Sequence, residues 1–343
     1  MRLRMLLPAL LLIGIVLAGL WHRERQPVLH VLDGWTMGST WSVRVVGPRD
    51  LDAAALRAGL EAQLQLLDAE LSGYREHTAL TRLNRAPVGE WIDLPPHLGR
   101  VLAFGRRLHD DSGGAFDLTV RPLVELWGFG AAEPRATLPA AAEIAAARAR
   151  IGQSRLEVSV DGTRIRRLAD IGVDVDAVAP GYAADVLAAW LRDRGLPDHL
   201  VEIGGELRAA GGRADGSPWQ IGIERPVAAR GDVAQVIAVG AGGVATSGDY
   251  RDHVEIDGRR YSHTLDPRSG RPVSHALTSV TVIAGDALAA DGYATALMVM
   301  GPEQGMAWAD ARRLPVFMIV RTANGVPVER YNEAFRPYLA GDP

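Results

Sequence analysis

Asp291 and Thr295 stand four residues apart in the segment AADGYATALMVMG, residues 289–301, which is predicted to be helical. Residues at this spacing lie on one face of a helix, about one turn apart. A carboxylate and a hydroxyl are hard oxygen donors that suit Mg²⁺ or Ca²⁺. Two ligands do not complete a metal site. A solvated Asp291, with Thr295 bonding back to its own helix, therefore stays an alternative.

Three aspartates alternate in the segment DIGVDVDAVAPG, at Asp170, Asp174 and Asp176. The alternation predicts that they share one side of a strand that leads into a helix. A helix N-terminus offers free N–H groups to an anion, and nearby carboxylates can hold a metal or accept from ligand N–H groups. Acidic residues also favour this position because they complement the helix dipole, which explains the pattern equally well.

The segment SGGAFDLTVRPLVELWGFG, residues 112–130, contains two glycines that let the backbone approach a ligand closely. Asp117 or Thr119 is equally suited to capping the helix that follows. The segment therefore predicts either a binding loop or an ordinary helix start.

A histidine and a Ser/Thr/Gly turn come late in the chain. The turn, in VATSGDY at residues 244–250, has a composition that can hold a phosphate. His263 falls in YSHTLDP, on the last residues of a predicted strand, with Tyr261 and Leu265 on the same strand face. Its imidazole is either a base directed into a cleft or a packed side chain of the sheet.

The composition limits the chemistry that is available. The 343 residues and 36.8 kDa suffice for one large domain or two small ones, and the net charge of -4 without a basic block argues against nucleic-acid binding. The chain has no cysteine and no lysine. Disulfides, thiolate nucleophiles, Schiff bases and the lysine of a Walker loop are therefore excluded.

Residues 1–27 predict a targeting segment. Arg2 and Arg4 precede an apolar run over residues 5–21, as in a signal anchor or a cleaved signal peptide. The sequence LAGL resembles a bacterial lipobox, but Leu20 replaces its cysteine, so the chain is not a lipoprotein. We expect an anchored protein with residues 28–343 exported; a cleaved signal and a buried core helix are the alternatives.

The elements that position these residues alternate between strands and helices. We predict strands over 40–46, 199–211, 218–226, 232–240 and 276–285, helices over 51–71, 97–111, 180–194 and 286–300, and hairpins around Asp161–Gly162 and Asp257–Gly258. Hairpins dominate the later half, so we expect an α+β fold of mixed, largely antiparallel sheets with interspersed helices. No G-x-G-x-x-G stands between a strand and a helix, which argues against a Rossmann site.

Seven motifs taken together resemble one family. They are MGSTWSV, GGAFDLT, DVDAVAPGYAAD, VEIGGEL, ATSGDY, YSHTLDPRSG and ADGYATALMVMG. In this order they closely resemble the FAD:protein FMN transferases of the ApbE family, from about Met37 to Gly301. The resemblance implies the ApbE fold and a metal-dependent reaction. In that reaction an acceptor threonine attacks FAD, FMN is transferred to the threonine, and AMP leaves.

The resemblance also implies roles for particular residues. Asp291, Thr295 and the Ala177 carbonyl are expected to hold Mg²⁺, and His263 is expected to act as the base for the acceptor threonine. FAD contacts are expected at Met37, Tyr74, Ala115, Phe116, Asp117, Asp174, Pro180 and Leu265. Relatives often have lysine or glutamate where this chain has Pro180, so a polar contact to FAD is missing there, although proline suits the first turn of a helix.

The implied partners are exported flavoprotein subunits of membrane redox complexes. The implied location is the bacterial inner membrane, reached through the N-terminus, with the globular part in the periplasm. Two other functions stay open: hydrolysis of FAD to FMN and AMP, and a carrier that binds FAD without modifying a partner. The joint presence of Asp291, Thr295 and His263 argues against a pure carrier.

Overall fold

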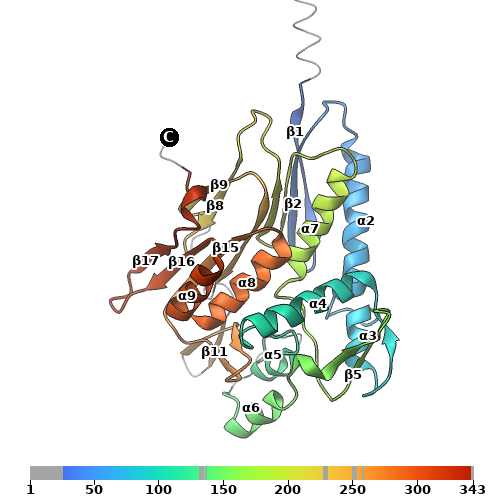
Figure 1. Cartoon of the computed structure of the whole chain (residues 1–343), viewed down its shortest axis with the longest axis vertical. Coiled ribbons are helices and arrows are strands. Elements are labelled where there is room, and N and C mark those ends of the chain that lie inside the picture. Colours follow the sequence, from blue (N-terminus) through green and yellow to red (C-terminus); the bar gives the residue numbers. More distant parts are fainter. Residues whose placement is uncertain are drawn as a thin grey trace, which may run out of the picture.

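An eight-stranded sheet forms the centre of the protein (Figure 1). The computed structural model describes residues 26–130, 135, 137–226, 231–248, 253–256 and 259–340, so the predicted signal segment lies almost wholly outside the described residues. All neighbouring strands of this sheet are antiparallel. In spatial order they are β1 (Val28–Thr36), β2 (Ser39–Gly47), β6 (His199–Ile203), β7 (Glu206–Ala210), β10 (Gly242–Gly248), β15 (Leu277–Ala284), β16 (Val316–Arg321) and β17 (Pro327–Tyr331).

Helices cover one face of the sheet, and a hairpin covers the other. The helices are α2 (Ala53–Leu71), α7 (Ala179–Arg192), α8 (Ala287–Met300) and α9 (Pro302–Arg312), and they lie in front of the sheet in Figure 1. The hairpin of β8 (Trp219–Glu224) and β9 (Val233–Val239) packs on the opposite face together with η2 (Arg336–Tyr338). Two apolar clusters result, because alternate residues of each strand point to opposite faces.

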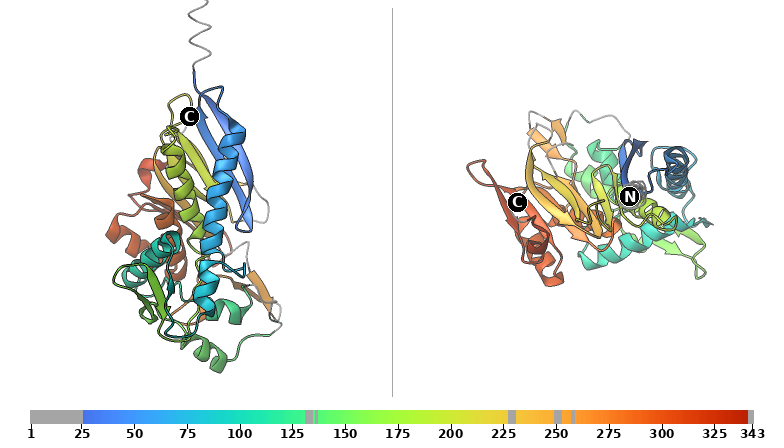
Figure 2. Two further views of the ribbon diagram at one scale, coloured as in Figure 1. Left: turned by 90° about the vertical axis from the view of Figure 1, so that its right-hand side faces the viewer. Right: turned by 90° about the horizontal axis from the view of Figure 1, so that it is seen from above.

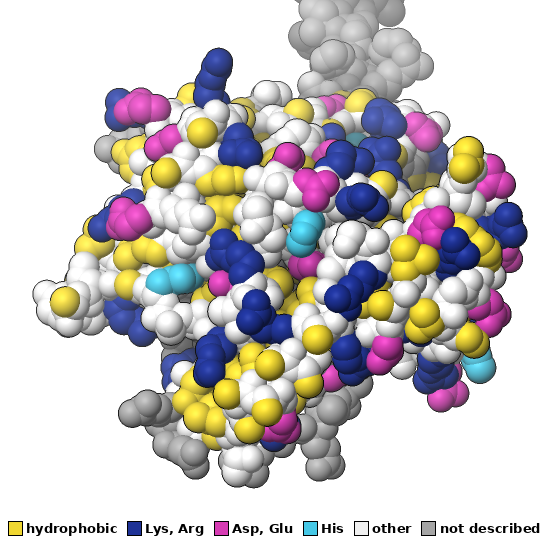
Figure 3. Space-filling view, turned by 60° about the horizontal axis from the view of Figure 1, so that its bottom comes forward, with side chains coloured by type: hydrophobic (Ala, Val, Ile, Leu, Met, Phe, Trp, Pro, Cys, Tyr) yellow, Lys and Arg dark blue, Asp and Glu magenta, His cyan; other side chains and the backbone are white. Residues whose placement is uncertain are grey.

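Shorter elements gather beyond one end of the large sheet, at the bottom of Figure 1 and in the left view of Figure 2. They are α3 (Ala79–Arg85), α4 (Pro96–Asp111), α5 (Arg121–Trp127), α6 (Ala141–Arg148), η1 (Gln153–Arg155), the small sheet of β3 (Ile92–Asp93), β5 (Arg164–Arg167) and β4 (Leu156–Val158), and the pairs β11 (His253–Ile256) with β12 (Arg259–Ser262) and β13 (Leu265–Asp266) with β14 (Arg271–Pro272). Arginine and carboxylate side chains are interspersed on the face shown in Figure 3.

The crossing of α7 and α8 is close because it includes a glycine. A Cβ atom on Gly181 would lie 2.4 Å from the Ala287 carbonyl oxygen and 2.8 Å from the Cβ of Asp291. Helix α8 is apolar on nearly all sides, as expected for a helix buried between a sheet and other helices. The glycine therefore lets α7 approach closely enough to touch the one carboxylate that α8 buries.

The α+β prediction is confirmed, and most predicted elements are found with small shifts at their ends. The strand predicted over 199–211 instead forms two paired strands, β6 and β7, and the turn predicted at Asp257–Gly258 lies outside the described residues. Asp286 caps α8 as predicted, with its carboxylate accepting from the Ala289 N–H at 2.8 Å. His263 was placed on the last residues of a strand, but β12 ends at Ser262, so His263 is the first residue after it. Of the turn predicted in residues 244–250, residues 244–248 belong to strand β10, and residues 249–250 lie outside the described residues.

No helix in the described part of the chain combines the length and the hydropathy that a bilayer crossing requires.

Candidate active site

Two cavities adjoin at the start of α7. The aromatic cavity, of about 830 Å³, is lined by residues that include Trp35, Met37 and Tyr74. The carboxylate cavity, of about 710 Å³, draws on distant segments of the chain and is lined by residues that include Ala115, Phe116, Asp117, Asp174, Ala177, Glu206, His263, Leu265, Asp291 and Thr295. Both cavities are also lined by Asp176 and Pro180, which therefore mark their junction.

The aromatic cavity has exposed rings and a strained turn. Trp35 is 71% exposed and Tyr74 is 63% exposed, although both are large apolar side chains. Met37 and Gly38 form the turn between β1 and β2, and Met37 has a φ of 48°, which is uncommon for a residue with a side chain. Such strain is concentrated at functional positions. Exposed aromatic faces at a cavity suit a flat ring system.

A tyrosine–carboxylate contact connects the two cavities. The Tyr74 hydroxyl donates to Oδ2 of Asp176 at 2.8 Å. Burial, together with the charge of Asp176, raises the pKa of Asp174 to about 7. Desolvation within the cavity also raises the pKa of Asp176, while the hydrogen bond from Tyr74 lowers it. The junction therefore holds two carboxylates that resist ionisation together.

Asp291 is buried where α8 meets the start of α7. Its Oδ2 accepts from the Gly181 N–H at 3.1 Å. That N–H bonds to Asp291 rather than to the Ala177 carbonyl four residues earlier, as it would in a longer helix. Burial raises the pKa of Asp291 well above its ordinary value, and the charges of Glu206 and Asp185 raise it further. The local field therefore favours a cation beside this carboxylate.

The residues of this corner fit a hard divalent cation. Ala177, Asp291 and Thr295 all line the carboxylate cavity and offer a carbonyl, a carboxylate and a hydroxyl. The Thr295 hydroxyl also lies 3.5 Å from that of Ser247 on β10. Within the described residues, no group of three His, Cys, Asp or Glu side chains could hold a metal. A site here must use one carboxylate with neutral oxygens, which is the donor type that Mg²⁺ accepts.

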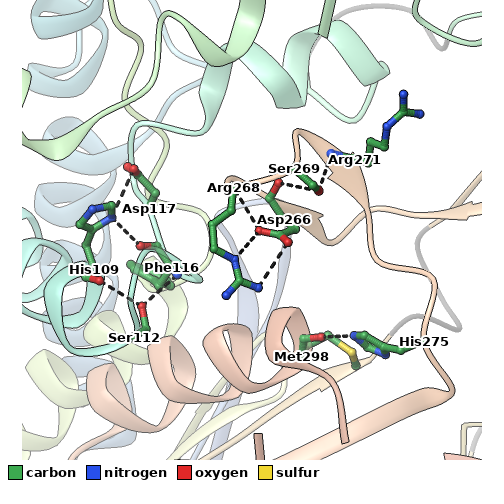
Figure 4. Close-up of polar contacts among 10 residues, drawn as sticks. All are labelled: His109, Ser112, Phe116, Asp117, Asp266, Arg268, Ser269, Arg271, His275 and Met298. Carbon is green, nitrogen blue, oxygen red and sulfur yellow. Dashed lines mark hydrogen bonds and ion pairs between the residues drawn. The ribbon is translucent and has the colours of Figure 1, made fainter. Parts of the chain in front are cut away.

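The loop after α4 is held by side-chain bonds to its own backbone (Figure 4). Nδ1 of His109 lies 3.0 Å from the Phe116 carbonyl and 3.3 Å from Oδ2 of Asp117. The hydrogen bond with Asp117 is the main cause that raises the pKa of His109. The Phe116 N–H donates to the Ser112 hydroxyl at 3.1 Å. The backbone of residues 115–117 is therefore fixed where it lines the carboxylate cavity.

The prediction that Asp117 or Thr119 caps the next helix is wrong. Helix α5 has Val120 at its N-cap and no side-chain cap. Oδ1 of Asp117 instead accepts from the N–H and the hydroxyl of Thr119, and that hydroxyl accepts from the Gly152 N–H at 2.7 Å. These bonds stabilise the loop, because they satisfy buried polar groups.

His263 follows β12 directly and lines the same cavity as residues 115–117. Leu265 is buried beside Tyr261, and both belong to a small apolar cluster under the loop. The carboxylate of Asp266 accepts from Nε of Arg268 at 2.9 Å, which braces the turn (Figure 4). The predicted metal ligands and the predicted base thus line one cavity, although they come from three separate segments of the sequence.

The three alternating aspartates do not share one side of a strand. Residues 173–175 lie outside any strand, and Asp170 is exposed and paired with Arg150 at 2.9 Å. Asp174 and Asp176, in contrast, line the carboxylate cavity. The alternation places only the last two aspartates at the site, because the chain bends into the start of α7.

No sequence pattern indicated Trp35 or Glu206, which both line the cavities. Trp35 lies two residues before the strained Met37, and no periodic pattern in this segment marks it as an exposed ring. Glu206 begins β7 within the motif VEIGGEL, but a single glutamate in a strand carries no signal. Burial raises the pKa of Glu206 to about 7, and the charge of Glu202 contributes.

Pro180 lies in the first turn of α7, as its ring geometry favours. It lines both cavities, so the polar contact that other side chains would make at this position is replaced by an apolar surface.

Comparisons with known proteins identify the family. The sequence profile of the ApbE family matches residues 37–318. An FAD:protein FMN transferase of Klebsiella pneumoniae is 39% identical over 315 residues, which cover 91% of this chain and 90% of the relative. The crystal structure of the Pseudomonas stutzeri flavinyl transferase ApbE in its apo form has a TM-score of 0.82 at 43% identity and covers 92% of this chain and 99% of that one. The flavin transferase ApbE from Vibrio cholerae has a TM-score of 0.83 at 37% identity and covers 91% and 100%. This chain belongs to the ApbE family of FAD:protein FMN transferases.

Proposed function

We propose that the chain transfers FMN from FAD to the hydroxyl of a threonine on an acceptor flavoprotein and releases AMP. The observation that carries the proposal is the convergence of Asp291, Thr295, Ala177 and His263 on one cavity that adjoins a second cavity with exposed rings. The two adjoining cavities suit the two parts of a dinucleotide. The carboxylate cavity can hold a cation beside the pyrophosphate, and the aromatic cavity can hold a flat ring.

In the transfer step, the threonine oxygen forms a bond to the FMN phosphorus while the phosphorus–oxygen bond to AMP breaks. His263 takes the proton of the threonine hydroxyl, and AMP leaves with its bridging oxygen as part of its phosphate. A base in this position contributes roughly 10²–10⁴-fold to the rate. The remaining requirement is alignment and charge stabilisation, as in other phosphoryl transfers.

Asp291, Thr295 and the Ala177 carbonyl would hold Mg²⁺. Bound there, the ion would neutralise pyrophosphate charge as a Lewis acid. Gly181 keeps the Asp291 carboxylate oriented through its N–H, and the neighbouring carboxylates supply the negative field that attracts the ion. These residues position the site before the substrate arrives.

The proposed FAD contacts follow the two cavities. Met37 and Tyr74, with Pro180 at the junction, would contact a ring of FAD. The backbone of residues 115–117, with Asp174 and Leu265, would contact the part of FAD in the carboxylate cavity. The fixed loop after α4 supports this assignment, because a rigid backbone can present N–H and carbonyl groups without an ordering cost.

Intact-protein mass spectrometry tests the function. The full chain is incubated with FAD, Mg²⁺ and an exported flavoprotein subunit that carries the threonine. The acceptor should gain the mass of one FMN, and its Thr→Val variant should gain none. EDTA should stop the reaction. Free FMN with an unmodified acceptor would instead indicate hydrolysis, and intact bound FAD would indicate a carrier.

We further propose that the protein is anchored in a bacterial inner membrane through residues 1–27, with residues 28–343 in the periplasm. The charged start and apolar run of the segment support this location. The acceptors would then be exported subunits of membrane redox complexes. Protease added to intact spheroplasts should digest the globular part; protection of that part would contradict the proposal.

A further inference from the structure

A third cavity, which we call the arginine cavity, shares Tyr74 with the aromatic cavity. Its volume is about 180 Å³, far above the roughly 10–15 Å³ that one water needs. It lies among the end of α3, the start of α5, β5 and the segment 170–172. Its charged lining consists of Arg85, Arg121, Arg150, Arg167, Glu125 and Asp170. None of the roles proposed above involves these residues.

The lining has an excess of positive charge. Four guanidinium groups and two carboxylates line the cavity, and Arg85 also pairs at 3.8 Å with Glu76 outside the lining, so one positive charge is left over. Glu125 is bound by Nε of Arg121 at 2.7 Å. Asp170 is shared, at 2.9 Å from Arg150 and 3.7 Å from Arg167. The carboxylates of the lining are therefore already engaged and cannot balance the remaining charge.

Arg167 shows the deficit directly. Its side chain is only 7% exposed. Its terminal nitrogens donate to the carbonyls of Ile171 and Ala86. Its Nε is buried and has no hydrogen-bond partner among the described residues. A buried donor on a charged group is costly to leave unsatisfied. The positive charge of Arg167 is therefore only partly compensated by the residues around it.

We propose that the arginine cavity binds an oxyanion: inorganic phosphate or the phosphate of a monoester. Guanidinium groups present paired donors that match the oxygens of such an anion. An anion offsets the excess positive charge of the lining, whereas a cation or an apolar molecule would not. The site lies beside the flavin-transfer centre without belonging to it, because the two share only Tyr74 and its loop.

The location implies a link to the neighbouring cavities. Tyr74 lines both the arginine cavity and the aromatic cavity, and its hydroxyl donates to Asp176 at the junction at 2.8 Å. An anion that repositions Tyr74 from one side would change the free energy of binding on the other side, and the effect would be reciprocal.

Isothermal titration of the full chain with inorganic phosphate tests the proposal. The protein is metal-free and saturated with FAD, so that the flavin site is filled, and chloride keeps the ionic strength constant. One phosphate should bind per chain. Arg150→Ala and Arg121→Ala should each weaken binding roughly tenfold to a hundredfold, because each removes charge-assisted hydrogen bonds.

Arg330→Ala is the matched control. Arg330 is 48% exposed and pairs with Glu303 at 2.9 Å, whereas Arg150 is 47% exposed and pairs with Asp170 at the same distance. The control should bind phosphate like the unmodified chain, and thermal unfolding should show all three variants folded. Equal binding by the Arg150 and Arg330 variants, or no saturable binding at all, would overturn the proposal.

A second titration, with AMP under the same conditions, distinguishes the two sources of the oxyanion. Tighter binding of AMP than of phosphate, lost in Arg150→Ala, would identify a monoester site. Binding of phosphate alone would identify a site for the free ion.

Discussion

The carboxylate cavity and the aromatic cavity meet at Asp176 and Pro180, but different kinds of side chain line them. The first contains Asp291, which is 7% exposed and has a strongly raised pKa. The second presents Trp35 and Tyr74, which are mostly exposed. The carboxylate cavity thus buries a carboxyl group whose ionised form is unfavourable, while the aromatic cavity offers accessible ring surfaces.

The difference indicates that the carboxylate cavity performs the reaction and that the aromatic cavity binds the substrate. Buried carboxylates that resist ionisation are costly for the fold and are retained where a cation or a reacting group needs them. Exposed rings cost little and add binding area. We therefore expect changes in the carboxylate cavity to alter kcat, and changes in the aromatic cavity to alter KM for FAD.

Asp291→Asn, in the carboxylate cavity, should reduce FMN transfer more than any of the substitutions that follow. The amide keeps the shape and can accept from Gly181 but cannot bind Mg²⁺ as a charged ligand, so FMN transfer should fall on the order of 10³-fold or more. Because burial penalises the carboxylate, the metal-free variant should unfold at the same or a higher urea concentration than the unmodified chain. Transfer assays and urea titrations measure both effects.

Asp185→Asn is the matched control for this substitution. Asp185 also faces α8, but its oxygens accept from the N–H groups of Ala287 and Leu288, each at 2.9 Å. Losing one of these two charge-assisted bonds is offset by relief of the burial that raises the pKa of Asp185 to about 6, so the free energy of unfolding should change by no more than about 1 kcal/mol while kcat stays within a few-fold. If both variants lost transfer equally, the carboxylate of Asp291 would have no special role.

His263→Ala should slow transfer by roughly 10²–10⁴-fold and leave FAD binding unchanged, because only the proton acceptor is lost. Single-turnover transfer and an FAD titration separate the two quantities. Transfer at the normal rate would show that another group takes the threonine proton.

The sequence predicted the residues of the carboxylate cavity better than their arrangement. Helical spacing singled out Asp291 and Thr295, and strand position singled out His263, but only the resemblance to a family gave them roles as metal ligands and base. Their convergence with Ala177 depends on the close crossing at Gly181, which no local pattern encodes. The capping role that was an alternative for Asp117 is not found, because its carboxylate accepts from Thr119 two residues on, and the Thr119 hydroxyl in turn accepts from the distant Gly152 N–H.

The aromatic cavity was harder to predict for a physical reason. Trp35 is an exposed ring in an otherwise alternating strand, so periodicity assigns it no function. Tyr74 was expected at the flavin site by resemblance only, and its bond to Asp176 spans 102 residues. Contacts of this sequence separation depend on the whole fold.

The pH dependence of stability should sharpen the comparison next. The pKa of Glu206 is raised to about 7, and so is that of Asp174, while an unfolded carboxyl titrates near 4. Between about pH 4 and 7 the folded, metal-free chain holds protons that the unfolded chain releases. The free energy of unfolding should therefore fall across this pH range and level off above pH 7.

Glu206→Gln should make that fall shallower, since the amide does not titrate. Urea titrations from pH 4.5 to 8 in EDTA measure the slope, with the solvent-exposed substitution Glu333→Gln as the control. Identical slopes in both variants would show that Glu206 titrates alike in the folded and unfolded chains.

Trp35→Ala is the mildest change, and it tests the holding side of the comparison. Removing an exposed indole that contacts a flat ring should raise KM for FAD about threefold to tenfold, because such ring contacts contribute about 0.5–1.5 kcal/mol. Leu29→Ala is the matched control: Leu29 is an exposed apolar residue of the same strand, 48% exposed, that does not line the cavity. The Trp35 variant should keep its kcat, since no reacting atom lies on this side of Asp176. A fall in kcat at unchanged KM would mean that the indole orders the site where the chemistry occurs, and the separation of the two cavities into holding and reacting parts would be wrong.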